Sequence, residues 1–228
     1  MKIFGLQKMT LLDYPSKVAC TIFLGGCNFR CPFCHNASVV LGTDGGEISE
    51  TELFAFLEKR KKLLDGVCIT GGEPLINSDI EVFIRKIRAM GYLIKLDTNG
   101  SFPKRLKSLL DSGLIDYIAM DIKNSPENYA KTAGADIDTD AIEESIRLIM
   151  SCGVPYEFRT TVVRGLHTAE DFHKIGEWIK GADTYYLQKF QNSGKLIGGG
   201  FDEFSDADME HFRDIALKHI KNTHLRGM

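Results

Sequence analysis

The sequence predicts an α/β fold with a parallel sheet, and three observations support this prediction. Short apolar, β-rich runs alternate six times with runs of helical periodicity along the 228 residues. Glycines and capping residues stand at the junctions between these runs. No linker and no internal repeat interrupts the alternation. Such alternation is typical of βα units, whose strands run parallel.

The six expected strands are compact apolar runs that end at glycine or at charged residues. Their ranges are 18–24, 67–70, 93–98, 117–123, 156–163 and 185–190. Residues 1–16 are mixed in character, and we expect no regular element there beyond a turn at Asp13-Tyr14-Pro15-Ser16. Loops are expected at residues 42–46 and, because of its glycines, at 191–200.

A predicted helix follows each strand, and most of these helices begin at a capping residue. Ser49 with Glu52 and Ser78 with Glu81 have the spacing of capping boxes, and Thr168 and Ser205 are further N-cap candidates. The helices are expected at about 49–64, 79–90, 103–112, 140–150, 168–180 and 205–220.

Six βα units are too few for a closed eight-stranded barrel but match an open six-unit barrel. A flat, doubly wound sheet shows the same alternation and remains an alternative. We expect one domain over residues 1–228, with its core at about 16–190 and a C-terminal helical extension at about 201–222.

The composition indicates a globular protein, with 43% hydrophobic residues and a net charge of −3. The basic run at 59–62 suits the end of a helix, so we expect no nucleic-acid partner. No apolar run approaches the roughly 20 residues of a membrane span, and no cleavable signal pattern begins the chain. The six cysteines do not frame a small secreted scaffold, which favours a reducing cytoplasm.

Three cysteines, Cys27, Cys31 and Cys34, lie within eight residues in a C-x3-C-x2-C pattern. A zinc site usually takes four ligands, often as two distant pairs, and this chain has no second pair. Three thiolates suit a cubane iron–sulfur cluster whose fourth iron is left open to a small molecule. Structural thiols or a partial zinc site are the alternatives.

Polar side chains share faces of several predicted strands near their C-terminal ends. They are Lys95, Asp97 and Asn99; Asp121 and Lys123; Glu157, Arg159 and Thr161; and Gln188. Buried charges are costly unless they are paired or used, and in parallel α/β barrels this end of the strands carries the chemistry. Internal ion pairing without a ligand is the alternative.

Gly71-Gly72-Glu73-Pro74 ends the second predicted strand, and its glycines allow a ligand to approach the backbone closely. With the cysteine triplet about forty residues upstream, and Phe33 just before Cys34, this motif resembles the radical S-adenosylmethionine (SAM) enzymes. Their fold is a partial (βα)6 barrel.

Further segments resemble one branch of that superfamily, the anaerobic ribonucleoside-triphosphate reductase activating proteins among the glycyl-radical-enzyme activases. The resemblance covers roughly residues 1–190, and its segments include Asp13-Tyr14-Pro15, Leu96-Asp97-Thr98-Asn99-Gly100, Ala119-Met120-Asp121-Ile122-Lys123 and Tyr156-Glu157-Phe158-Arg159-Thr160-Thr161.

This resemblance implies a set of site residues. Cys27, Cys31 and Cys34 would hold one [4Fe-4S] cluster, and Gly71, Gly72 and Glu73 would bind the amino group of SAM. Phe33 would lie near the adenine. A monovalent cation beside the SAM carboxylate would be held by Asp97, Thr98, Asp121 and the Ala119 carbonyl, with Lys123, Arg159 and the candidate Gln188 nearby.

The resemblance also implies partners. A flavodoxin or ferredoxin would deliver one electron, and the resulting 5′-deoxyadenosyl radical would take hydrogen from a glycine of an anaerobic ribonucleotide reductase. No cysteine lies between Asn36 and Ser49, so we expect no second cluster. Activation of a pyruvate formate-lyase type enzyme, a small-molecule substrate such as a deazapurine precursor, and a simple electron carrier are the alternatives.

Overall fold

The computed structural model describes residues 1–42, 47–192 and 196–228. The chain forms two compact units, each built from several segments. The first unit comprises Met1–Asn28, Ser38–Thr98 and Phe102–Ile118. The second comprises Phe29–Ala37, Asn99–Ser101 and Ala119–Met228. The loops predicted at 42–46 and 191–200 include residues 43–46 and 193–195, which lie outside the described residues.

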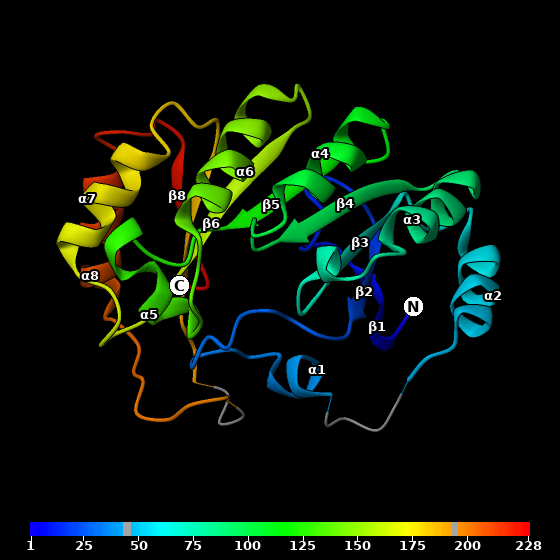
Figure 1. The fold of residues 1–228 in the computed structure, drawn as a ribbon, viewed down its shortest axis with the longest axis horizontal. Helices are drawn as coiled ribbons and strands as arrows, with labels where there is room; N and C mark the ends of the chain where they lie inside the picture. Colours follow the sequence, from blue (N-terminus) through cyan, green and yellow to red (C-terminus); the bar gives the residue numbers. More distant parts are fainter. Residues whose placement is uncertain (43–46, 193–195) are drawn as a thin grey trace. The chain divides into compact units, whose positions relative to one another are not determined.

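The strands follow one another in chain order in one sheet, β1 to β8 (Figure 1). They are β1 (Ile3–Thr10), β2 (Ala19–Leu24), β3 (Gly66–Gly71), β4 (Leu93–Thr98), β5 (Tyr117–Asp121), β6 (Tyr156–Val162), β7 (Tyr185–Lys189) and β8 (Thr223–Arg226). Strand β2 pairs in parallel with β3, β3 with β4, β6 with β7, and β7 with β8. The predicted α/β class is therefore confirmed, and the six predicted strands correspond to β2–β7.

Two strands were not predicted, so the expectations for both ends of the sheet are wrong. Strand β1 lies in the segment expected to be irregular and pairs antiparallel with β2, with irregular register near both of its ends. Only Ile3 and Thr10 of this strand are buried, so the sequence lacks the alternation that marks a strand. Strand β8 has four residues, too few to show a period, and lies just beyond the helical extension expected at about 201–222.

The helices occur close to their predicted positions. They are α1 (Ala37–Leu41), α2 (Glu50–Arg60), α3 (Ile80–Ala89), α4 (Pro103–Asp111), α5 (Tyr129–Ala133), α6 (Thr139–Ser151), α7 (Ala169–Trp178) and α8 (Asp206–Ala216). The short helices α1 and α5 were not predicted, nor were the 3-10 turns Pro74–Ile76 and Pro126–Asn128. The caps of α2, α7 and α8 are complete capping boxes. The capping box predicted for α3 is wrong, because Asp79 is the N-cap and takes the Ser78 hydroxyl hydrogen bond itself.

Each unit buries an apolar core around its strands. In the first, Ile22, Ile69 and Leu96 are fully buried, as are Leu53 and Leu57 of α2. In the second, α7 and α8 lie side by side and join through the stacked rings of Phe172 and Phe212, whose centroids are 4.7 Å apart (Figure 1).

Within the described residues, no helix combines the length and the hydrophobicity that a membrane span requires.

Candidate functional site

The loop that carries Cys27 is held by the glycine-rich turn after β3. The N–H of Gly72 donates to the Leu24 carbonyl at 2.9 Å, and the N–H of Glu73 donates to the Gly26 carbonyl at 2.8 Å. A Cβ atom at Gly72 would lie 1.9 Å from the Gly26 oxygen, which only glycine avoids. Two motifs that are far apart in the sequence are thus joined by backbone hydrogen bonds within the first unit.

Cys31 and Cys34 share one tight turn in the second unit. The N–H of Cys34 donates to the Cys31 carbonyl at 3.0 Å. Backbone bonds fix this turn from both sides, from Arg30 N–H to the Ala133 carbonyl (2.9 Å) and from Gly198 N–H to the Pro32 carbonyl (2.7 Å). The conformation of the turn that carries these two thiols is therefore fixed by backbone hydrogen bonds to other segments of the second unit.

The side chains beside this turn are aromatic. Phe33 is buried and meets Phe190 edge-on at a centroid distance of 6.4 Å. The imidazole of His35 lies 5.3 Å from the same ring.

Glu73 is a fully buried carboxylate held in one orientation. It caps the 3-10 turn that follows, accepting from the Leu75 N–H at 3.0 Å and from the Thr98 hydroxyl at 2.8 Å. Gly71, two residues before it, has φ +126°, and a Cβ there would lie 2.2 Å from the Leu24 oxygen. The close approach at Gly71 and Gly72 is therefore to the backbone of the chain itself.

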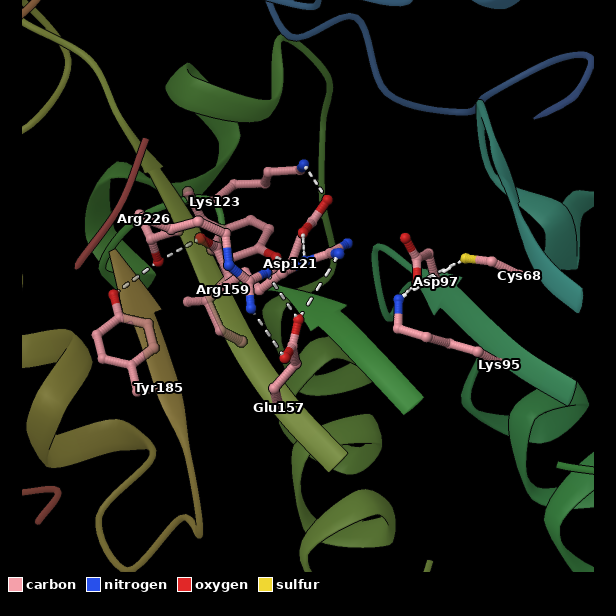
Figure 2. Close-up of polar contacts among 12 residues, drawn as sticks. Cys68, Lys95, Asp97, Asp121, Lys123, Glu157, Arg159, Tyr185 and Arg226 are labelled. Atoms are coloured by element: carbon pink, nitrogen blue, oxygen red, sulfur yellow. Dashed lines mark hydrogen bonds and ion pairs between the residues drawn. The ribbon is translucent and has the colours of Figure 1, made fainter. Parts of the chain in front are cut away.

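Asp97 has a basic partner on its own strand. Lys95, which is 1% exposed, forms an ion pair with the Asp97 carboxylate (Figure 2). The Cys68 thiol lies 3.7 Å from Asp97 Oδ1 and 3.8 Å from Lys95 Nζ. The two-residue spacing placed Lys95 and Asp97 on one face, as predicted. Cys68 is fully buried, and its thiol contacts this charged pair.

Asp121 is the centre of a second charged group, in the second unit (Figure 2). Lys123 Nζ lies 3.0 Å from its Oδ2, and Arg159 Nε lies 2.9 Å from its Oδ1. Burial alone would raise the pKa of Asp121, but Arg159 and Lys123 lower it well below its ordinary value. The carboxylate is therefore ionised over the whole physiological pH range.

The same group extends to β8, which sequence reasoning missed. Arg226 reaches both oxygens of the buried Glu157 at 3.1 and 3.3 Å, and its guanidinium lies 3.8 Å from the Tyr186 ring centroid. Arg159 Nη1 lies 3.9 Å from Glu157 Oε1 and links the two carboxylates. No local motif marks Arg226, since its role depends on strand β8.

Positive charge from this group acts on the cysteine turn. Burial raises the pKa of the Cys34 thiol above its ordinary value, and the nearby Lys123 and Arg30 offset only part of that rise. Lys123 also interacts electrostatically with Cys31. Cations near thiols favour the thiolate form, which is the form that binds metal.

A model of the radical SAM superfamily matches residues 21–179 of this chain. The chain belongs to the radical SAM superfamily. This radical SAM protein is also 31% identical over 235 aligned positions to the "Putative glycyl-radical enzyme activating enzyme" of Methanocaldococcus jannaschii, covering 98% of this chain and 95% of the relative. The family resemblance inferred from the motifs is therefore confirmed at the level of the glycyl-radical-enzyme activating proteins.

Two other comparisons concern a second activating enzyme and the fold. The pyruvate formate-lyase-activating enzyme of Listeria monocytogenes is 30% identical over 143 residues, covering 57% of this chain and 56% of the relative. The crystal structure of Streptococcus suis SuiB bound to precursor peptide SuiA has a TM-score of 0.72 at 15% identity, covering 91% of this chain and 48% of SuiB. The similarity to SuiB confirms the partial-barrel fold class.

The superfamily implies a [4Fe-4S] cluster and SAM, and the donor set of this radical SAM protein fits them. None of the six cysteines is in a disulfide, and two of the motif thiols lie in one turn near a cation. Cys27 belongs to the first unit and Cys31 and Cys34 to the second. Among the described residues, no three or more His, Cys, Asp or Glu side chains are gathered as a metal cage. The fit therefore rests on the chemistry of the thiols.

Gln188 lies at a cavity of about 440 Å³ in the second unit. The other lining residues are polar or basic, apart from one glycine: His35, Lys189, Gln191, Asn192, Arg226 and Gly227. None of the described residues that line this cavity is a carboxylate, which suits ligands with carbonyl or anionic groups. His35 therefore faces the same space as the predicted site residue Gln188.

Proposed function

We propose that this radical SAM protein generates a glycyl radical on an anaerobic ribonucleoside-triphosphate reductase. The observation that carries this proposal is the junction of the two motifs, in which the turn before Glu73 binds the loop of Cys27 through two backbone hydrogen bonds. Similarity over nearly the full length to an activating enzyme supports the activase class. The Asp97-Thr98-Asn99-Gly100 and Met120-Asp121-Ile122-Lys123 segments resemble the reductase-activating branch.

In this proposal Cys27, Cys31 and Cys34 hold one [4Fe-4S] cluster. When bound, the cluster and SAM supply a 5′-deoxyadenosyl radical after one electron arrives from a flavodoxin or ferredoxin. The chain contributes binding, orientation and the exclusion of water. The positive charge of Lys123 and Arg30 partly offsets the burial that disfavours the Cys34 thiolate, and Lys123 also attracts a Cys31 thiolate.

Glu73 is proposed to bind the amino group of SAM. Its carboxylate is already oriented by two hydrogen bonds, so it loses little freedom when the ligand binds. Gly71 and Gly72 let the turn before Glu73 pack against the backbone of Leu24 and Gly26, which holds Glu73 beside the Cys27 loop. A charge-assisted bond of this kind contributes about 1.5–3 kcal/mol.

Lys123 and Arg159 are proposed to bind the SAM carboxylate, and Asp121 holds both of them in position. Phe33 is proposed to lie near the adenine, and Gln188 to line the substrate side of the site. The substrate atom is a glycine Cα, which no side chain shields from an approaching radical.

The decisive experiment uses the reduced holoprotein, SAM and the candidate reductase under anaerobic conditions. A glycyl doublet in the electron paramagnetic resonance spectrum is expected, and it should vanish when the reductase's radical glycine is replaced by alanine. A doublet formed only on a pyruvate formate-lyase type enzyme would show a different target. SAM turnover with modification of a deazapurine precursor, and no protein radical, would contradict the activase proposal.

A further inference from the structure

The carboxylate of Asp97 is paired with a cation that belongs to the chain. Lys95 comes from the same strand, is 1% exposed, and forms an ion pair with Asp97, which is itself 13% exposed (Figure 2). The Cys68 thiol lies close to both groups, 3.7 Å from Asp97 Oδ1 and 3.8 Å from Lys95 Nζ. Lys95 therefore neutralises Asp97 from within strand β4.

Asp121, the other acidic residue of the expected cation site, is paired in the same way. Each of its two carboxylate oxygens has its own basic partner, Lys123 at 3.0 Å and Arg159 at 2.9 Å. A metal ion that bound these oxygens would meet two cations at contact distance.

The charged group around Asp121 also carries a surplus of positive charge. We define the Asp121 cluster as Asp121, Lys123, Glu157, Arg159 and Arg226, which are linked by ion pairs. Two carboxylates and three cations leave a formal charge of +1. A bound carboxylate would bring the cluster to neutrality.

We propose that this protein binds SAM without a monovalent cation, with Lys95 as the internal counter-ion of Asp97 and the Asp121 cluster as the partner of the SAM carboxylate. The inference rests on the proposed function, because it assumes that SAM binds beside these residues. It replaces the expected cation, which Asp97, Thr98 and Asp121 would otherwise hold. A metal ion at Asp97 would have to displace an ammonium group that is buried and would then lack its partner, which is unfavourable.

The test measures SAM binding to the anaerobically reconstituted holoprotein by calorimetry in potassium, sodium and tetramethylammonium chloride at equal ionic strength. The last cation is too large to coordinate carboxylates closely. Dissociation constants within twofold of one another are expected. A tenfold or greater loss of affinity in tetramethylammonium would overturn the inference while leaving the proposed function intact. Absence of SAM binding in all three salts would overturn both.

A charge-removing variant sharpens the test. In Lys95→Met the Asp97 carboxylate loses its counter-ion, so SAM binding should weaken about tenfold in tetramethylammonium and recover in potassium. The thermal unfolding temperature of the same variant should rise with potassium, while that of the wild type does not. Lys107→Met is the matched control, because it removes the Lys from an exposed Lys–Asp pair on α4. If Lys95→Met showed no potassium response in either measurement, Lys95 would not be the counter-ion; should that variant fail to fold, the wild-type salt series decides alone.

Discussion

Replacing Gly72 by alanine should separate the two motifs of the first unit. The added Cβ would lie 1.9 Å from the Gly26 oxygen and 3.1 Å from the Cys27 Cβ, whereas ordinary contacts begin at 3.4 Å. The Gly26 carbonyl must therefore move by about 1.5 Å, taking the neighbouring Cys27 with it. Such a shift breaks the 2.8 Å hydrogen bond from the Glu73 N–H.

The cost can be estimated from these two effects. Losing one buried hydrogen bond costs about 1–3 kcal/mol, and overpacking a tight site costs about 1–3 kcal/mol more. We expect the Gly72→Ala protein to be less stable by about 2–6 kcal/mol, which lowers the urea midpoint by about 1 M or more. Iron content after anaerobic reconstitution should also fall, because Cys27 is displaced.

The assay compares urea unfolding of the apoprotein, followed by circular dichroism, with iron per chain after reconstitution. Gly199→Ala is the control, since a Cβ there meets nothing within 4 Å and the residue has no positive φ. The reasoning would be refuted by a Gly72→Ala protein whose midpoint and iron content both match those of the wild type.

Three further variants test other parts of the site. Cys31→Ala should lose both the cluster and SAM cleavage. Cys152→Ala is the control and should keep about four irons per chain, because the Cys152 thiol contacts the Ile149 carbonyl at the end of α6. Full SAM cleavage by Cys31→Ala would disprove the ligand assignment. Glu73→Gln should bind SAM roughly ten- to a hundredfold more weakly with normal iron content, and calorimetry showing equal affinity would place the amino group elsewhere. Burial lowers the pKa of His167, whose ring contacts the backbone of Val163 and Lys123. The imidazole therefore stays neutral in the folded protein, whereas it takes up a proton in the unfolded chain below about pH 6.5. The free energy of unfolding should fall as the pH drops below that value, by at most about 1.4 kcal/mol per pH unit. In His167→Gln the free energy of unfolding should depend less on pH, whereas His211→Gln, at an exposed position, should leave the pH dependence unchanged. Equal pH dependence in the two variants would show that His167 is not the group responsible.

Secondary structure could be predicted from the sequence wherever the residues that determine an element lie within one short segment. Strands β2–β7 are apolar and lie between helices with clear caps, so they could be located from pattern alone. The Ser49 cap was found because Glu52, three positions later, closes the box, whereas Thr168 was found from its residue type alone. At Ser78 the pattern failed because the adjacent Asp79 competes for the same N-cap position.

The rest depends on contacts between distant segments. The pairing of Lys95 with Asp97 follows from the two-residue period of one strand, so sequence could place both on one face. The contribution of Arg226 could not be predicted, because four residues of β8 show no periodicity and its partner Glu157 lies 69 positions away. Pattern also could not tell which of the polar strand residues pair with one another.

The distance between Glu157 and Arg226 has a consequence for biosynthesis. Strand β6 leaves the ribosome 69 residues before the arginine that binds both oxygens of its buried glutamate. At about 5–20 residues per second, translation of that interval takes roughly 3–14 seconds. During this time the Glu157 carboxylate lacks Arg226, so burying strand β6 would leave that negative charge poorly compensated. The second unit therefore reaches its native packing only after β8 has been made, and iron delivered to the nascent chain earlier would meet the cysteine turn beside an incomplete set of charges.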